Sequence, residues 1–79
     1  HLKSLALSHN FLTAVPQTLS LCSHLRYLSL QANNFTDMPN AILELALLET
    51  LDMSKNQLRT IPYIIKRLER LKVFSVDNN

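Results

Sequence analysis

Apolar residues return at a fixed interval along this chain, and the pattern is clearest in Leu48–Asn56, LETLDMSKN. Within this stretch Leu48, Leu51 and Met53 have the spacing L-x-x-L-x-L, and Asn56 follows three residues later. The same string occurs three more times, in steps of 23 residues: Leu2, Leu5, Leu7, Asn10; Leu25, Leu28, Leu30, Asn33; and Leu71, Phe74, Val76, Asn79. The chain is therefore one 23-residue unit, repeated without insertion.

Each unit begins with a predicted strand. The alternation at Leu51-Asp52-Met53 is the period-two pattern of a short, half-buried strand. We expect such strands near residues 4–7, 27–30, 50–53 and 73–76.

The asparagine after each strand has a compact amide with two donors and an acceptor, which can satisfy backbone groups where the chain turns. The alternative interpretation is that each asparagine is an ordinary turn residue. The fixed register favours a ladder of stacked structural asparagines that joins one coil to the next: Asn10, Asn33, Asn56 and Asn79.

A proline follows in every full unit, at Pro16, Pro39 and Pro62. Its fixed φ and missing N–H suit the first position of a short helix or 3-10 turn. Apolar residues three apart come after each proline, as on one face of a tight helical segment. These are Leu19 and Cys22, Ile42 and Leu45, and Ile65 and Leu68.

A unit of this length cannot bury its apolar face alone, so neighbouring units must stack. We expect a curved solenoid of three repeats, 2–24, 25–47 and 48–70, and a partial fourth, 71–79, with strands on one face and helical returns on the other. The chain has no glycine, which indicates that no turn needs a conformation open to glycine alone. The missing start methionine and the end in mid-repeat favour a piece of a longer protein, with further repeats on both sides.

Composition excludes several classes of protein. The 79 residues make one small domain, and 47% of them are hydrophobic, which fits a packed protein rather than a disordered one. The charge of +2 is too slight to indicate nucleic acid or a membrane surface. One cysteine excludes an internal disulfide and a Cys-rich zinc site. No apolar run approaches the roughly 18 residues of a membrane span, and no stretch has the pattern of a signal peptide.

The unit L-x-x-L-x-L-x-x-N-x-L-x-x-I-P-x-x-I-x-x-L resembles the leucine-rich repeat over the whole chain. It is similar to the intracellular 23-residue class found in Ras-pathway scaffolds and fungal adenylate cyclase. The stretches LRYLSLQANNF, LETLDMSKN and LKVFSV resemble the fungal leucine-rich-repeat component of the RAM morphogenesis network, which acts through an NDR-type kinase. This resemblance implies an α/β fold, a right-handed β-α superhelix with a parallel concave sheet and short helical or 3-10 returns on the convex side.

The resemblance also implies a function. We expect a cytoplasmic, non-catalytic protein-interaction module that acts as a scaffold in signal transduction and needs no cofactor. Its partner would be a protein, such as a small GTPase or a component of the kinase network.

Binding must use the side chains that alternate with the inward leucines and point from the concave face. Arg26 and Tyr27 are the predicted anchors, because Arg and aromatic side chains dominate interface energetics. Any single residue of this face could instead be exposed to solvent without contacting a partner. The predicted partner-binding residues are Arg26, Tyr27, Ser29, Gln31, Asp52, Ser54, Lys55 and Asp77.

No residue is predicted to be catalytic, to bind a cofactor or to hold a metal. A Ser/His/Asp triad could be drawn on the concave sheet, but such small polar residues occur there by default. The three histidines share no metal-ligand spacing, and Cys22 occupies a core position. Two surface groups could be contact sites. The first is a basic cluster, which could instead be an ordinary solvated surface: Arg59, Lys66, Arg67, Arg70 and Lys72. The second is a set of apolar residues expected to be partly exposed, which could instead be packing positions: Leu21, Leu43, Leu47, Tyr63 and Ile64.

Two other functions stay open. An extracellular receptor or adhesion repeat is favoured by the glycosylation acceptor Asn34-Phe35-Thr36, but the lack of Cys-rich caps and the Ile-Pro unit oppose it. The repeats could also be the targeting arm of a larger enzyme, such as a cyclase or a phosphatase.

Overall fold

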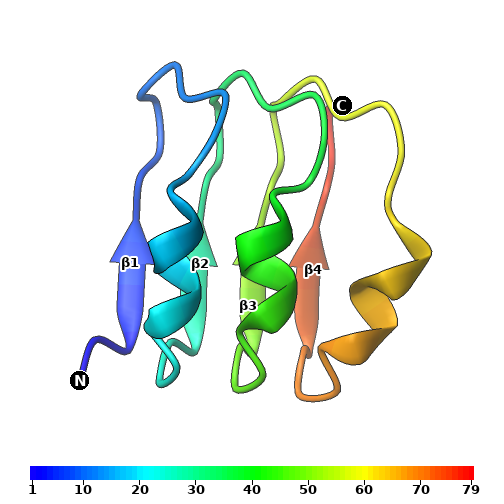
Figure 1. The fold of residues 1–79 in the computed structure, drawn as a ribbon. Helices are drawn as coiled ribbons and strands as arrows, with labels where there is room; N and C mark the ends of the chain where they lie inside the picture. Colours follow the sequence, from blue (N-terminus) through cyan, green and yellow to red (C-terminus); the bar gives the residue numbers. More distant parts are fainter.

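The computed structural model describes residues 1–79 as four short strands that alternate with three 3-10 helices (Figure 1). The strands are β1 (Ser4–Ala6), β2 (Tyr27–Ser29), β3 (Thr50–Asp52) and β4 (Val73–Ser75). The helices are η1 (Gln17–Leu21), η2 (Asn40–Glu44) and η3 (Tyr63–Arg67). The predicted strands are confirmed, each ending one residue earlier than expected.

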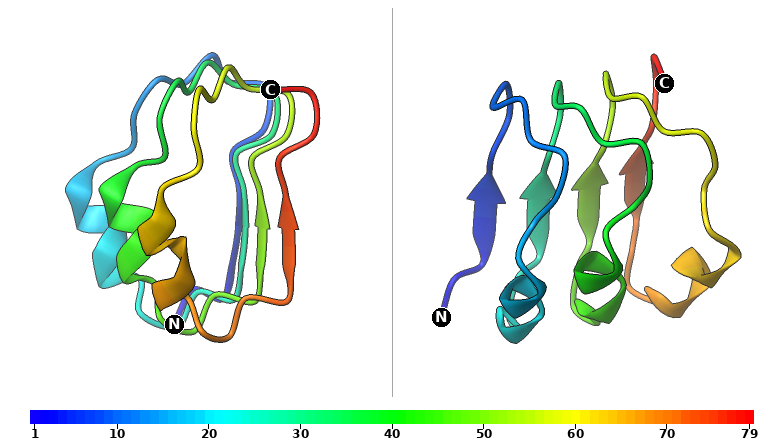
Figure 2. Two further views of the ribbon diagram at one scale, coloured as in Figure 1. Left: turned by 90° about the vertical axis from the view of Figure 1, so that its right-hand side faces the viewer. Right: turned by 45° about the horizontal axis from the view of Figure 1, so that its top comes forward.

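The strands form one parallel sheet in the order β1-β2-β3-β4. The register pairs equivalent positions of successive units, so Leu5 lies beside Leu28, Leu28 beside Leu51, and Leu51 beside Phe74. Figure 2 shows two layers, with the sheet on one side and the three helices on the other. The predicted solenoid is confirmed. The sheet surface directed away from the helices, predicted as the concave face, is called the strand face below.

The core lies between these two layers and is most complete in the middle coils. Leu28 and Leu51 have no exposed surface, whereas Leu5 and Phe74, at the same position in the end coils, are partly exposed. Full burial of a leucine side chain stabilises a fold by roughly 1.5–3 kcal/mol. The middle coils are therefore the most rigid support for whatever the strand face carries. None of the helices has the length and apolar character needed to cross a bilayer.

The prolines lie one position earlier than predicted. Pro16, Pro39 and Pro62 precede their helices, with ψ between 135° and 144° and so extended rather than helical. The carbonyl of Pro16 nevertheless accepts the first helical bond, from the Leu19 N–H at 3.0 Å. The proline ring fixes φ but leaves ψ free to be extended. The same residue can therefore end the extended segment and provide the first carbonyl acceptor of the 3-10 helix.

The absence of glycine does not keep the backbone out of the left-handed region. The residue before each ladder asparagine has a positive φ, between 57° and 62°: His9, Ala32, Lys55 and Asn78. A residue with a Cβ can adopt this conformation at a cost of about 1–2 kcal/mol. The repeated turn therefore stores a small strain in every coil.

Candidate protein-binding face

Asparagine side chains tie the turns of neighbouring coils together. Asn33 Oδ1 accepts the N–H groups of Asn10 and Leu12, both at 2.9 Å. Its Nδ2 donates to the carbonyls of Leu7 at 2.9 Å and Leu30 at 3.0 Å. One amide thus joins backbone groups of its own coil to those of the preceding coil, and the edge of the strand face is held in a fixed position.

The ladder has a direction, because each asparagine reaches back to the preceding coil. Asn56 repeats this arrangement toward the second coil, and Asn79 does so toward the third. Asn10 has no coil before it in the structure, and its side chain makes a single bond, from Nδ2 to the Ser8 carbonyl at 3.0 Å. Asn10 and Asn56 therefore occupy equivalent positions with very different hydrogen bonding.

The strand face begins with a row of four charged residues just before the strands, here called the strand-start row: Lys3, Arg26, Glu49 and Lys72. Backbone bonds of 2.8 Å connect it, from the Arg26 N–H to the Lys3 carbonyl, from Glu49 to Arg26 and from Lys72 to Glu49. The next row along the strands is Ser4, Tyr27, Thr50 and Val73.

The two predicted anchors lie at the centre of these rows and are available to a partner. Arg26 Nη1 donates to Glu49 Oε2 at 2.8 Å, and the Arg26 side chain remains 46% exposed. A guanidinium has five N–H donors, so most of them are free beyond this single contact. Tyr27 follows directly and is 38% exposed. Both side chains project from the second coil, which the core supports best.

Two of the predicted contact residues are buried instead. Ser29 is 3% exposed, and its hydroxyl lies 3.1 Å from the Ser8 hydroxyl of the neighbouring coil. Ser54 is 6% exposed, and its hydroxyl donates to Asp52 Oδ1 at 2.6 Å. These short side chains are too deeply buried to offer surface to a partner. Neither residue can therefore serve as a main contact for a partner.

The other predicted residues lie toward the strand ends. Gln31 and Asp52 are half-buried, and Asp52 also accepts the Ser54 N–H at 2.9 Å. Lys55 and Asp77 are exposed, and the Lys55 N–H donates to the Asp77 carbonyl at 2.9 Å. The strand face therefore has mostly cations at the strand starts, whereas Asp52, Asp77 and the cation Lys55 lie toward the strand ends.

The helical side carries its own exposed residues. Tyr63 is 81% exposed, and Lys66 Nζ lies 4.5 Å from the centre of its ring, a cation–π arrangement. Ile64 is partly exposed, but its equivalent Ala41 is buried where the next coil packs against it. The exposure of Ile64 therefore reflects its position on an end coil. Leu43, expected to be partly exposed, is buried, because η2 lies between η1 and η3.

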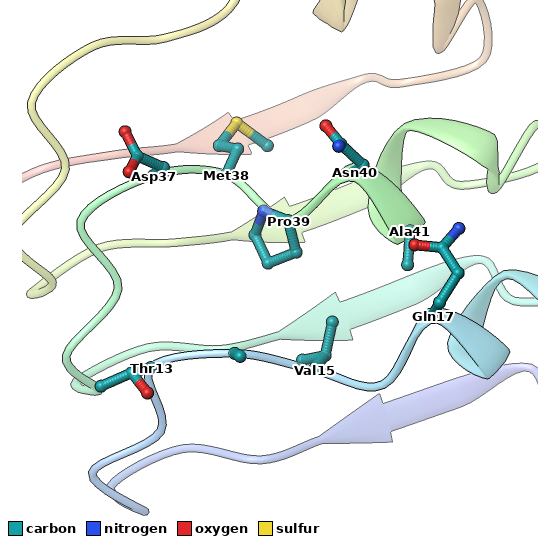
Figure 3. A pocket seen from close by; sticks show the side chains of 9 residues that line it. Thr13, Val15, Gln17, Asp37, Met38, Pro39, Asn40 and Ala41 are labelled. Carbon is teal, nitrogen blue, oxygen red and sulfur yellow. The ribbon is translucent and has the colours of Figure 1, made fainter.

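A hollow of about 390 Å³ lies between the first two coils, along the segments that lead into η1 and η2 (Figure 3). Its lining residues are Thr13, Ala14, Val15, Gln17, Asp37, Met38, Pro39, Asn40 and Ala41. Its charged residue, Asp37, is exposed and contacts Arg59 at 3.4 Å. The hollow is an open surface feature without a buried polar group to hold a ligand. No three His, Cys, Asp or Glu side chains in the structure are grouped to hold a metal.

Comparison with known proteins agrees with this geometry. A family model described as "Leucine-rich repeat region" matches residues 1–79. The chain belongs to the leucine-rich-repeat family. Such repeats generally form protein-interaction modules and are typically non-catalytic, and their solenoids offer extended binding surfaces.

A solved leucine-rich-repeat protein from Leptospira interrogans has the same fold, with a TM-score of 0.85 at 23% sequence identity. The match covers 96% of this chain but 25% of that protein, so the chain spans about a quarter of its length. No curated protein matches the sequence.

Proposed function

We propose that this leucine-rich-repeat segment is the partner-binding module of a cytoplasmic signalling scaffold. The observation that carries the proposal is the pair Arg26 and Tyr27, adjacent, partly exposed and mounted on the best-buried part of the solenoid. Side chains of these types, held on a rigid support, are the usual energetic centres of protein interfaces.

The proposed contact set follows from burial. It keeps the side chains that have surface on the strand face: Arg26, Tyr27, Gln31, Asp52, Lys55 and Asp77. The polar, mixed charge of this surface suits a folded protein or an extended peptide. The resemblance of the 23-residue unit to Ras-pathway scaffolds, fungal adenylate cyclase and the RAM network makes small GTPases and kinase-network components the first partners to test. Further repeats of the same protein would extend this face.

The experiment uses the full-length protein as bait in an extract of its source. Replacing both Arg26 and Tyr27 with Ala should weaken binding of the main protein partner by about 1–3 kcal/mol. The matched control replaces Lys66, Arg67 and Arg70 on the helical side with Ala, and should retain the partner. A partner lost with the control and kept with the Arg26/Tyr27 variant would place the site on the helical side and overturn the proposal.

One observation favours a different setting. Asn34-Phe35-Thr36 is a glycosylation acceptor, and Asn34 lies on a partly exposed turn, although Phe35 is buried. If the repeat were part of an extracellular receptor or adhesion protein, native protein would change its electrophoretic mobility after glycosidase treatment. The cytoplasmic proposal predicts no change.

A further inference from the structure

Three of the eight basic residues of this protein lie in the strand-start row, at one edge of the strand face. The strand-start row has three cations, Lys3, Arg26 and Lys72, and one carboxylate, Glu49, so its net charge equals the +2 of the whole chain. The remaining basic and acidic residues balance each other. The other end of the strand face carries two carboxylates, Asp52 and Asp77, and one cation, Lys55.

The spacing of the row is fixed by its backbone. Its members are connected by consecutive hydrogen bonds of 2.8 Å, so each lies one strand from the next. Neighbouring strands are about 4.8 Å apart, which places Lys3 about 14 Å from Lys72. In an extended peptide, side chains on one side repeat every ~6.7 Å, so residues four apart are separated by about 13 Å. The two outer cations therefore match two side chains of one extended segment.

The centre of the row is already ordered. Glu49 holds Arg26 through one N–H at 2.8 Å and leaves the other donors of the guanidinium free. A ligand carboxylate that meets Arg26 does not have to order this long side chain itself, which lowers the entropic cost of binding.

The neighbouring row supplies an apolar contact. Tyr27 is 38% exposed and Val73 is 53% exposed, and both lie directly beside the cations. The opposite end of the strands, with Asp52, Asp77 and the single cation Lys55, has a net charge of −1 and attracts an acidic ligand less than the strand-start row does. Charge and apolar surface together select both the chemistry of the ligand and its position.

We propose that the partner presents an extended acidic segment, with carboxylates four residues apart over Lys3 and Lys72 and an apolar side chain toward Tyr27 and Val73. This inference rests on the proposed function, because it names the partner chemistry for the same strand face.

The test uses a blocked peptide with Glu at positions 1 and 5 and Val at position 3, which lie on one side of an extended chain, and the same peptide with Gln in place of Glu. Lys3→Glu with Lys72→Glu should weaken binding of the Glu peptide by about tenfold or more at low salt. Lys66→Glu with Arg67→Glu makes the same charge change on the helical side and should alter affinity by less than about twofold. The Gln peptide should bind weakly to all forms. Equal losses in the two variants would overturn the proposal.

Amide chemical shifts of the unaltered protein provide a second measurement that does not depend on the variants folding. The Glu peptide should shift Lys3, Arg26, Tyr27 and Lys72. Shifts centred on η3, or tighter binding of a short oligothymidylate to the same row, would overturn the proposal in favour of another site or a nucleic acid. If the natural partner needs Arg26 and Tyr27 but is indifferent to Lys3→Glu with Lys72→Glu, the acidic segment is wrong and the protein-binding function stands.

Discussion

Replacement of Asn56 by Leu tests how the coils are held together. The Phe35 N–H donates to Asn56 Oδ1 at 3.1 Å and has no other partner in the chain. Asn56 Nδ2 donates to the carbonyls of Leu30, Met53 and Ser54. These carbonyls each keep a second donor, from Asn33, Asn79 and Ala32 respectively. The substitution therefore leaves one buried group, the Phe35 N–H, without any hydrogen bond.

The magnitude follows from these contacts. An orphaned buried donor costs about 1–3 kcal/mol, and each lost bond whose acceptor keeps another donor costs less than the usual ~1 kcal/mol. We expect Asn56→Leu to lower the free energy of unfolding by about 2–4 kcal/mol. Asn10→Leu makes the same change at the same repeat position but removes a single exposed bond, so it should cost less than about 0.5 kcal/mol.

Urea unfolding followed by circular dichroism measures both variants, with Gln57→Leu as an exposed neighbour control. Gln57 makes no side-chain hydrogen bond and should behave like Asn10. Losses of similar size at Asn56 and Asn10 would show that the ladder does not join the coils, and would refute the reasoning.

Two further predictions concern strain and charge. Ala32→Gly should raise the free energy of unfolding by about 0.5–1 kcal/mol, because relief of the positive φ exceeds the entropy cost of glycine. The control Ala41→Gly, in buried η2, should lower it, so thermal unfolding should show a gain at Ala32 only. Glu49→Gln should change stability by less than about 1 kcal/mol, since the Arg26–Glu49 pair is partly exposed; a larger loss in urea unfolding would mean that this pair supports the fold.

The periodicity of the sequence predicts most of the fold because every element recurs at the same interval. Leu28, Leu51 and their equivalents determine which residues of each strand face inward, and stacking then places the strands in register. The left-handed backbone at Ala32 could not be predicted this way, because no glycine marks it. The turn geometry comes from the asparagine that follows.

The candidate site is less predictable for a different reason. Alternation predicts which side of the sheet a residue occupies but not how deeply its side chain lies, and Ser29 and Ser54 are buried. The ion pair between Arg26 and Glu49 depends on rotamers that no repeat pattern specifies. The burial of Leu43 depends on its flanking helices, which its own repeat does not contain.

Photo-crosslinking from the two tyrosines tests the central claim most directly. Tyr27 lies on the strand face and Tyr63 on the helical side, and Tyr63 is the more exposed of the two. A photoreactive benzoylphenylalanine would replace each in turn in the full-length protein within its native cell. Binding along the strand face predicts crosslinks to a protein partner from position 27 and none from position 63. Crosslinks from position 63 alone would contradict the account.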